Sequence, residues 1–349
     1  MAGLGAPGGR RRGERCDRGS DGERLSVALV TGARGFAGAW LARALLERGD
    51  EVVSLDRGRP ERPRSTLSLL GVESEVADVV GDLRDGELLR LILREHRVTD
   101  VYHLAAEAIV GTVRRSPVRA FETNVRGTWT LLDACLAERV ERVVVASSDK
   151  AYGAQTTVPY REDFALAATA PYEASKAAAD VIARSYWPSY GLPVAVTRFA
   201  NIYGGGDLNF SRLVPEAICA ALDGRAPVLR SDGSPERDFL YVTDAADAYI
   251  TIAAGLDRDE LRGEAFNAGG GRPHRVGEVV ATIARLAGTG VAPDVRGDGN
   301  PEGEIDRQFV DPTKLREACG WSPSVELDDG LARAIEWYRA HPEARPPVG

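Results

Sequence analysis

Long apolar runs and an excess of basic residues are both missing from this sequence. No apolar run approaches the roughly 20 residues that a membrane-spanning helix needs, and no charged head followed by an apolar stretch marks a signal peptide. The formal net charge is −8, so a nucleic-acid backbone is not an expected partner. We therefore expect a cytoplasmic protein that binds neither membranes nor nucleic acids.

Cysteine and histidine are scarce as well. The four cysteines lie far apart without a CxxC pair, and the four histidines form no cluster with the spacing of metal ligands. The sequence therefore predicts neither a disulfide framework nor a metal site.

The first 24 residues are rich in glycine and arginine and contain few apolar side chains. Such a segment cannot bury enough surface to offset chain entropy, so we expect residues 1–24 to form a disordered tail. A basic arm that binds nucleic acid is the alternative interpretation.

From Leu25 onward, short apolar runs alternate with amphipathic stretches. Helices are expected from about Pro117 to Ala137 and from about Tyr172 to Tyr190, and RVVVA at 142–146 and PVAVTRF at 193–199 are typical of buried strands. Strands separated by helices predict βαβ units, and hence an α/β fold with a Rossmann-type, doubly wound parallel sheet.

The regular alternation weakens after Asn201, where a glycine-rich loop begins. We therefore expect a smaller α/β lobe that binds the substrate. The predicted Rossmann domain comprises residues 25–200 and a returning segment, 238–256. The predicted smaller lobe comprises residues 201–237 and 257–349.

The motif TGARGFAG directly follows the first predicted strand and precedes an amphipathic helix. Its glycines, Gly32, Gly35 and Gly38, allow a tight turn and a close approach of backbone amides to a pyrophosphate at the helix N-terminus. Asp56 ends the second strand, where a carboxylate accepts the ribose hydroxyls of NAD and repels the 2′-phosphate of NADP. NAD is therefore the predicted cofactor, although the adjacent Arg57 keeps NADP as an alternative.

Asp82 and Leu83 follow the third predicted strand and are candidates to hold and sandwich the adenine. Ordinary turn residues at strand ends are the alternative interpretation of Asp56 and Asp82.

Tyr172 and Lys176 form a YxxxK pair near the start of a helix. Residues four apart share a helical face, so the ammonium is expected to lie near the phenol and to lower its pKa towards neutrality. A tyrosinate formed in this way is a base for a hydroxyl proton. The same pair is also common on surface helices that have no catalytic role.

Taken together, these motifs resemble the extended short-chain dehydrogenase/reductase family of nucleotide-sugar enzymes, over residues 25 to about 339. The resemblance rests on TGARGFAG, GDL at 81–83, HLAA at 103–106, SSDKAYG at 147–153, YEASK, RFANIYGGGD and RDFLYV. It implies that Ser148 hydrogen-bonds the reacting sugar hydroxyl, that Tyr172 removes its proton, and that Lys176 binds the nicotinamide ribose. Hydride then passes from sugar C4 to NAD, and a homodimer is expected.

The resemblance also implies two sets of binding residues. The expected cofactor site consists of Gly32, Arg34, Gly35, Phe36, Ala37, Gly38, Asp56, Asp82, Leu83, Ala105, Tyr172 and Lys176. The expected nucleotide-sugar site consists of Glu107, Ser148, Asn201, Arg212, Leu213, Arg237 and Arg307. Arginine suits a diphosphate because its planar fork pairs with phosphate oxygens, but a surface ion pair is the alternative role for each arginine. For Glu107, an acid near a helix start is the alternative to a sugar contact.

The pair Asp149 and Lys150, directly after Ser148, bears on the reaction type. By resemblance, 4,6-dehydratases carry an acid and a second ionisable residue here, whereas 4-epimerases usually carry small uncharged residues. The Asp-Lys form resembles CDP-glucose 4,6-dehydratases and departs from the Asp-Glu form of dTDP-glucose dehydratases. Lys150 is then either the base that removes the C5 proton or an ammonium that stabilises the enolate. A 4-epimerase and a non-enzymatic, NAD-binding regulatory protein are the alternatives to a dehydratase.

Overall fold

The computed structural model describes residues 26–58, 64–299 and 305–346. The predicted disordered tail, residues 1–24, lies outside the described residues.

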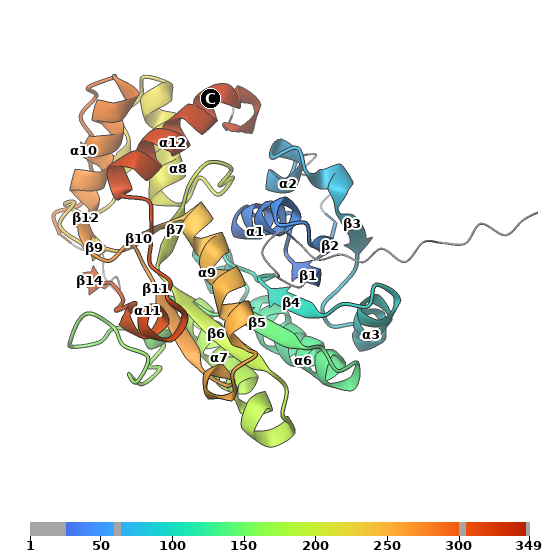
Figure 1. The fold of residues 1–349 in the computed structure, drawn as a ribbon. Coiled ribbons are helices and arrows are strands. Elements are labelled where there is room, and N and C mark those ends of the chain that lie inside the picture. Colours follow the sequence, from blue (N-terminus) through green and yellow to red (C-terminus); the bar gives the residue numbers. More distant parts are fainter. Residues whose placement is uncertain (1–25, 59–63, 300–304, 347–349) are drawn as a thin grey trace, which may run out of the picture.

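A seven-stranded parallel sheet forms the centre of the protein (Figure 1). Its strand order is β11-β6-β5-β4-β1-β2-β3, so the order reverses beside β1, where β4 and β2 flank it. In open parallel sheets, ligands bind outside the carboxyl ends of the strands at such a reversal. The predicted Rossmann-type sheet is confirmed. The strands are β1 (Val27–Thr31), β2 (Glu51–Asp56), β3 (Ala77–Val80), β4 (Asp100–His103), β5 (Arg142–Ala146), β6 (Val194–Phe199) and β11 (Ala265–Ala268).

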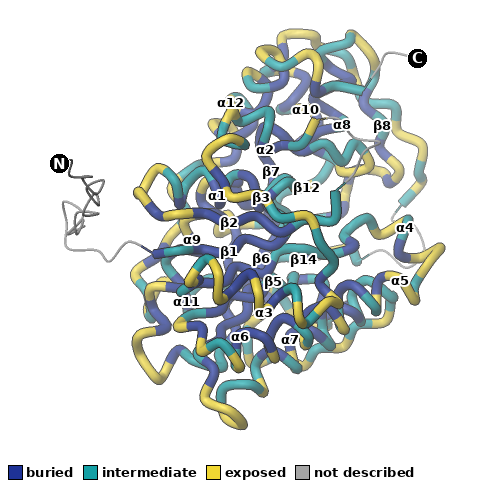
Figure 2. The backbone as a smooth tube through the Cα atoms, turned by 90° about the vertical axis from the view of Figure 1, so that its right-hand side faces the viewer, coloured by how far each residue is buried: buried dark blue, intermediate teal, exposed yellow. Residues whose placement is uncertain are grey.

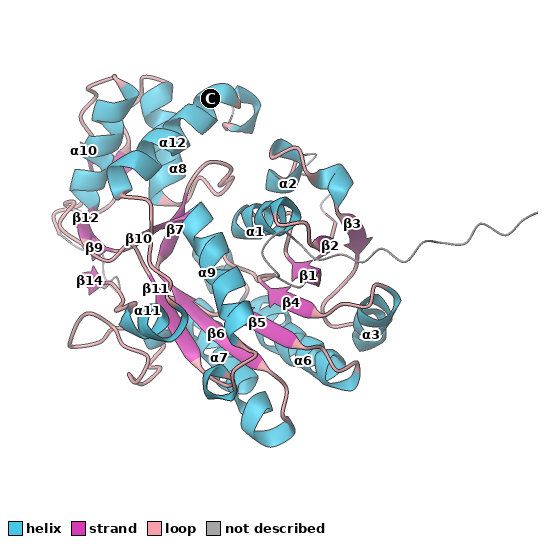
Figure 3. Ribbon diagram, viewed as in Figure 1, coloured by secondary structure: helices cyan, strands magenta, loops and turns pink. Residues whose placement is uncertain are grey.

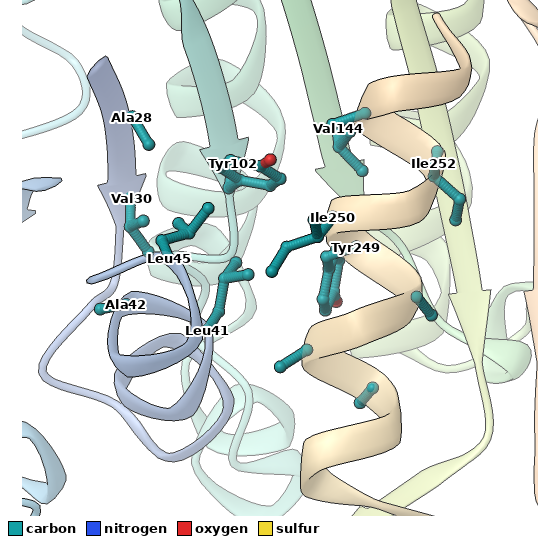
Figure 4. Packing of buried hydrophobic residues seen from close by; sticks show 14 of the residues in the cluster. Ala28, Val30, Leu41, Ala42, Leu45, Tyr102, Val144, Tyr249, Ile250 and Ile252 are labelled. Atoms are coloured by element: carbon teal, nitrogen blue, oxygen red, sulfur yellow. The ribbon is translucent and has the colours of Figure 1, made fainter. Parts of the chain in front are cut away.

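Helices cover both faces of this sheet because its strands are apolar on both sides. On β1, Val30 joins the core beneath α1 (Phe36–Glu47) and α9 (Val242–Gly255), whereas its neighbour Leu29 joins the core beneath α3 (Gly86–Glu95), α6 (Gly127–Ala137) and α7 (Pro171–Tyr190). Figure 4 shows Leu41 and Leu45 of α1 and Tyr249 of α9 gathered over the first face. Figure 2 shows the central strands β1 and β2 buried between these layers.

A smaller group of helices and short strands lies beyond the carboxyl ends of the strands (Figure 3). It has its own apolar core, in which Ile218, Ile283 and Ile335 come from three different helices. Its helices are α8 (Leu213–Leu222), α10 (Val276–Ala287) and α12 (Leu327–Ala340). Its short strands are β7 (Asn201–Tyr203), β8 (Val228–Leu229), β9 (Glu236–Arg237), β10 (Phe239–Tyr241), β12 (His274–Arg275), β13 (Asp294–Val295) and β14 (Arg307–Gln308).

The structure differs from the predicted domain division at β10, β11 and α11. β10 falls within residues 238–256, which were assigned to the Rossmann domain, yet it pairs with β7 of the smaller group. β11 falls within residues 257–349, which were assigned to the smaller lobe, yet it pairs in parallel with β6 at the edge of the large sheet. The pairing is satisfied by the backbone of a four-residue segment, AFNA, which is too short for its periodicity to identify it as a strand. Helix α11 (Thr313–Cys319) lies against the same strand and also belongs with the large sheet.

The helix expected from about Pro117 to Ala137 is present but interrupted. A π-helical turn, Glu122–Arg126, separates α5 (Pro117–Phe121) from α6. π-Turns inside helices are frequent near functional sites, and this one carries Asn124, whose side chain bonds the backbone of Glu107. The remaining short elements are α2 (Thr66–Leu69), α4 (Val110–Arg115), and 3₁₀ turns at Glu73–Glu75, Asp149–Tyr152, Asp259–Leu261 and Pro342–Ala344.

No helix in the described ranges is both long enough and apolar enough to cross a membrane. Within those same ranges, no group of three or more His, Cys, Asp or Glu side chains is arranged to hold a metal ion.

Candidate active site

The turn between β1 and α1 requires glycine at two positions. Gly32 has φ 79°, and a Cβ there would lie 2.9 Å from the Cα of Ala105. A Cβ at Gly38 would lie 2.2 Å from the carbonyl oxygen of Gly32, so this helix packs closely on the turn that precedes it. Gly35 is the N-cap of α1 and provides no side-chain cap, which leaves the amide groups of the first helical turn available to an anion.

The carboxylate of Asp56, at the end of β2, faces this turn. Its Oδ2 accepts a hydrogen bond from the backbone N–H of Arg34 at 3.0 Å. The side chain of Arg34 bonds Glu73 at 2.6 Å and Asp78 at 2.7 Å, and Arg57 bonds the carboxylate of Glu107 at 2.5 Å. Both arginines near Asp56 are therefore already paired with carboxylates, which reduces the positive charge that they could offer to a 2′-phosphate.

Asp82 and Leu83 have different surroundings. The carboxylate of Asp82 bonds Arg84 at 2.7 Å, and this bond lowers the pKa of Asp82 to about 2. Leu83 is buried, and its Cβ would lie 3.0 Å from a Cβ added at Gly127 of α6. The contact of Asp82 with adenine stays a prediction, and the ion pair with Arg84 shows that its carboxylate is engaged within the protein.

Tyr172 and Lys176 lie in the first turns of α7, where Pro171 occupies the first helical position and Glu173 accepts the N–H of Ala170. Lys176 is buried, which lowers its pKa to about 8, and its Nζ donates to the carbonyl oxygen of Ala146 at 2.8 Å. Lys176 is thereby held against the end of β5, next to the segment that begins with Ser147 and Ser148.

The expectation that Lys176 lowers the pKa of Tyr172 is wrong for this structure. Burial raises the pKa of Tyr172 to about 12, and the negative charge of Asp149 adds to the effect. The charge of Arg212 and a hydrogen bond with Ser148 act in the opposite direction but do not outweigh burial. The ammonium of Lys176 is bonded to a strand carbonyl, while partial removal of the phenol from water disfavours its charged form.

Ser148, Asp149 and Lys150 form the start of the 3₁₀ turn Asp149–Tyr152, directly after β5. The hydroxyl of Ser148 accepts the backbone N–H of Lys150 at 3.2 Å and donates to Oδ1 of Asp149 at 3.0 Å. Asp149 is 2% exposed, and within the described part of the chain its Oδ2 has no hydrogen-bond partner.

Burial raises the pKa of Asp149, whereas the charge of Lys150, the bond from Ser148 and the charge of Arg237 lower it less strongly. A buried carboxyl with a raised pKa retains its proton more readily than an exposed one, so Asp149 is suited to donate a proton.

The residues expected to bind the nucleotide sugar come mostly from the smaller lobe. Arg212, at the N-cap of α8, bonds the buried Asp207 at 2.9 Å, and its charge reaches the phenol of Tyr172. Leu213 begins the same helix and is half-buried. The charge of Arg237 acts on Asp149 from strand β9. The structure therefore brings Arg212 near Tyr172 and Arg237 near Asp149.

Three other predicted residues are engaged in bonds within the protein. The Nδ2 of Asn201 donates to the carbonyl oxygen of Asp238 at 3.0 Å. Arg307 is 57% exposed and pairs with Glu236 at 2.7 Å, as the ion-pair interpretation anticipated. Arg57, which is partly exposed, and Arg119, which is exposed, both bond Glu107. Burial raises the pKa of this carboxyl, but the two arginines together lower it more. Ligand contacts by these residues stay predictions.

Asp238 was missed by the sequence analysis. Its side chain is fully buried, and burial raises its pKa to about 7 although the N–H of Gly270 donates to its Oδ1 at 2.8 Å. The negative charge of Asp149 contributes to the same rise. The motif RDFLYV pointed to this segment, but only its arginine was taken as functional, because a single acidic residue between two short strands gives no sign of its burial.

Comparison with known proteins points to one class of enzyme. A family model described as GDP-mannose 4,6 dehydratase matches residues 29–334. The sequence is 33% identical over 335 residues to a dTDP-glucose 4,6-dehydratase from Xanthomonas campestris, a match that covers 90% of this chain and 93% of that protein.

Two crystal structures have similar folds. That of a dTDP-glucose 4,6-dehydratase from Bacillus anthracis in complex with NAD has a TM-score of 0.81 and 29% identity, and the match covers 92% of this chain and 98% of that one. That of a UDP-glucose 4-epimerase from Thermotoga maritima with UDP-glucose has a TM-score of 0.81 and 28% identity, with 90% and 99% of the two chains covered.

Proposed function

We propose that this chain, which belongs to the GDP-mannose 4,6-dehydratase family of extended short-chain dehydrogenase/reductases, is an NAD-dependent nucleotide-sugar 4,6-dehydratase. The observation that carries the proposal is Asp149. It lies directly after Ser148, it is buried with one oxygen lacking a partner among the described residues, and its pKa is raised. An elimination needs a proton donor of this kind at the departing hydroxyl, whereas a simple epimerisation does not.

The cofactor site fits NAD. The close approach of backbone at Gly32 and Gly38 suits a pyrophosphate, and Asp56 accepts the adenosine ribose hydroxyls. Lys176 binds the nicotinamide ribose. When bound, NAD would supply a positively charged nicotinamide ring and the hydride acceptor and donor that the reaction needs.

The protein groups carry out the proton transfers. Ser148 positions the C4 hydroxyl, and Tyr172 takes its proton. A phenol with a pKa of about 12, a value that already includes the charge of Arg212, is a poor base at neutral pH. This step would therefore need a further positive charge, such as that of the bound nicotinamide. Once C4 is a ketone, the proton on C5 becomes acidic. A base, for which Lys150 is the candidate, then takes the C5 proton, and Asp149 gives its proton to the C6 hydroxyl, which leaves as water and creates the C5–C6 double bond.

The role of Lys150 can be tested with the Lys150→Met variant. If Lys150 removes the C5 proton, the variant loses exchange of that proton with deuterated water. If Lys150 only stabilises the enolate, the variant keeps some exchange. A variant that exchanges and dehydrates at wild-type rates would remove Lys150 from the reaction.

The smaller lobe is proposed to hold the nucleotide diphosphate, with Arg212 and Arg237 closest to the catalytic turn. A CDP-glucose-like sugar is the proposed substrate. This rests on the Asp-Lys pair and on the loop sequence GGGD at 204–207 followed by FSRLVP. In that loop Asp207 bonds Arg212, so the loop positions an arginine that the diphosphate needs.

A nucleotide-sugar 4-epimerase is the second candidate, favoured by the equal TM-score to the Thermotoga maritima epimerase. Incubating the protein with a panel of nucleotide sugars and weighing the products distinguishes the two. A dehydratase releases a product lighter than its substrate by one water. A product that has the mass of the substrate but the opposite configuration at C4 would show that the protein is an epimerase and not a dehydratase.

We also propose a homodimer. Large apolar side chains are exposed on the adjoining helices α5, α6 and α7, and such a patch on a folded protein is typical of an interface. The exposed side chains are Val118, Phe121, Trp129, Val181 and Tyr190.

A further inference from the structure

A buried hydrogen-bond network lies behind the catalytic turn and connects it to helix α7. At its centre is Arg198 of β6, which is 1% exposed. Its guanidinium bonds both carboxylate oxygens of Asp180, at 2.7 and 2.9 Å, and its Nη1 donates to the hydroxyl of Tyr152 at 3.1 Å. The hydroxyl of Tyr152 in turn donates to Oδ1 of Asn267 at 2.8 Å. These four residues are called the Arg198 network.

The network holds the two proposed catalytic pairs from behind. Tyr152 ends the short turn that begins with Asp149 and Lys150. Asp180 lies one helical turn after Lys176 on the same face of α7. Arg198 therefore joins the turn Asp149–Tyr152, which carries the residues proposed for the elimination, to α7, which carries those proposed for the oxidation. The bonds that join them are shielded from water.

The bonding of these side chains favours one fixed arrangement. The guanidinium uses Nε, Nη1 and Nη2, and its carbon atom lies 4.9 Å from the centre of the Tyr152 ring. A planar guanidinium that pairs with a carboxylate through two bonds sets direction as well as distance. Charges buried to this degree are costly unless they are paired, so any shift of Tyr152 or Asp180 that breaks a bond is disfavoured.

We propose that Tyr152, through its hydroxyl and Arg198, is a positioning residue that keeps Asp149 and Lys150 in register with Tyr172 and Lys176. The proposal rests on the proposed dehydratase function. Its consequence is that loss of the hydroxyl separates the two half-reactions. Oxidation at C4 continues, because Tyr172 and Lys176 stay on α7, while the elimination slows, because the turn is no longer fixed.

The variant Tyr152→Phe tests this, with Tyr160→Phe as the matched control. Tyr160 is equally buried and its ring packs on that of Tyr152 at 5.4 Å. Among the described residues, its hydroxyl has one hydrogen bond, accepted from the backbone N–H of Gln155 at 3.4 Å. In a single turnover, NADH absorbance reports the oxidation and the mass of the quenched product reports the loss of water. Both variants are measured at a temperature at which melting curves show them folded.

We expect Tyr152→Phe to reduce NAD at the rate of the control, to accumulate NADH, and to lose water about 10-fold to 100-fold more slowly. Equal slowing of both steps, or dehydration at the control rate, overturns the proposal while leaving the dehydratase function intact. A wild type that never releases a lighter product overturns that function, and this proposal with it.

If Tyr152→Phe does not fold, Asn267→Ser removes the acceptor of the same hydroxyl and leaves Tyr152 and Arg198 in place. If Asn267→Ser accumulates NADH, even less than is expected of Tyr152→Phe, the proposal is supported. If Asn267→Ser accumulates no NADH, the proposal is contradicted.

Discussion

Replacing Asp149 with asparagine removes the proposed proton donor while changing little else. Oδ1 of the amide still accepts the hydroxyl of Ser148, which lies 3.0 Å from the corresponding carboxylate oxygen. The new NH₂ takes the place of Oδ2, the atom that has no partner among the described residues. Because the carboxyl is buried and its pKa is raised, a neutral amide is also tolerated electrostatically.

The expected loss follows from the role of a general acid. A positioned acid accelerates proton transfer by about 10²-fold to 10⁴-fold, which corresponds to about 2.7 to 5.4 kcal/mol of activation free energy. We expect Asp149→Asn to dehydrate its substrate more slowly than the wild type by a factor within that range, while NAD is still reduced by the sugar. The intermediate that accumulates is then a 4-keto sugar together with NADH.

The pH dependence provides a second measure of the same residue. If protonated Asp149 is the acid, the elimination rate of the wild type is highest at low pH and falls as the pH rises through the raised pKa of this group. In Asp149→Asn that decline disappears, because no group titrates at this position.

The assay combines NADH absorbance with the mass of the quenched product. The control is Asp163→Asn, the same change at a carboxylate that is 65% exposed and pairs with Arg161. Dehydration by Asp149→Asn at the rate of this control, with the same pH profile as the wild type, would show that Asp149 is not the acid.

Four further outcomes are expected. Tyr172→Phe abolishes oxidation at C4 but leaves the affinity for the nucleotide sugar nearly unchanged in a binding titration, since it removes a proton acceptor and little contact area; normal turnover would contradict its role. NAD binds more tightly than NADP because Asp56 meets the ribose hydroxyls, and equal dissociation constants for the two would refute this. The folded-state pKa of Asp238, about 7, exceeds its ordinary value of 3.8, so the stability that this carboxyl contributes is full below pH 3.8 and is lost as the pH rises through about 7. The melting temperature of Asp238→Asn should therefore fall less than that of the wild type between about pH 5 and about pH 8, and parallel declines would contradict the burial argument. Val181→Asp places a charge on the exposed apolar face of α7 and should yield monomers in sedimentation, whereas an unchanged mass would exclude that face as the interface.

The sequence by itself determined the elements whose signals are local. The β1 turn required glycine partly for local reasons: Gly32 has a positive φ, and a Cβ at Gly38 would meet the carbonyl oxygen of Gly32. The close approach of Gly32 to Ala105 came only with the tertiary structure. The strand RVVVA and the helix that ends at Tyr190 were identified correctly because their apolar patterns are long or strongly periodic. Family motifs led us to expect Ser148 and Tyr172 near each other. Each motif is a short segment attached to a strand or helix that the sequence predicts.

Only the tertiary structure decided which of these groups are buried and what they bond. Asp149 is buried in a turn that Tyr152 ties to Arg198 of β6 and Asn267 of β11, two residues distant in sequence. Lys176 bonds a strand carbonyl, and burial raises the pKa of Tyr172. Glu107 is held by Arg57 and Arg119. Burial and charge pairing depend on which segments meet in space, and a pKa depends on both, so neither can be read from the spacing of residues along the chain.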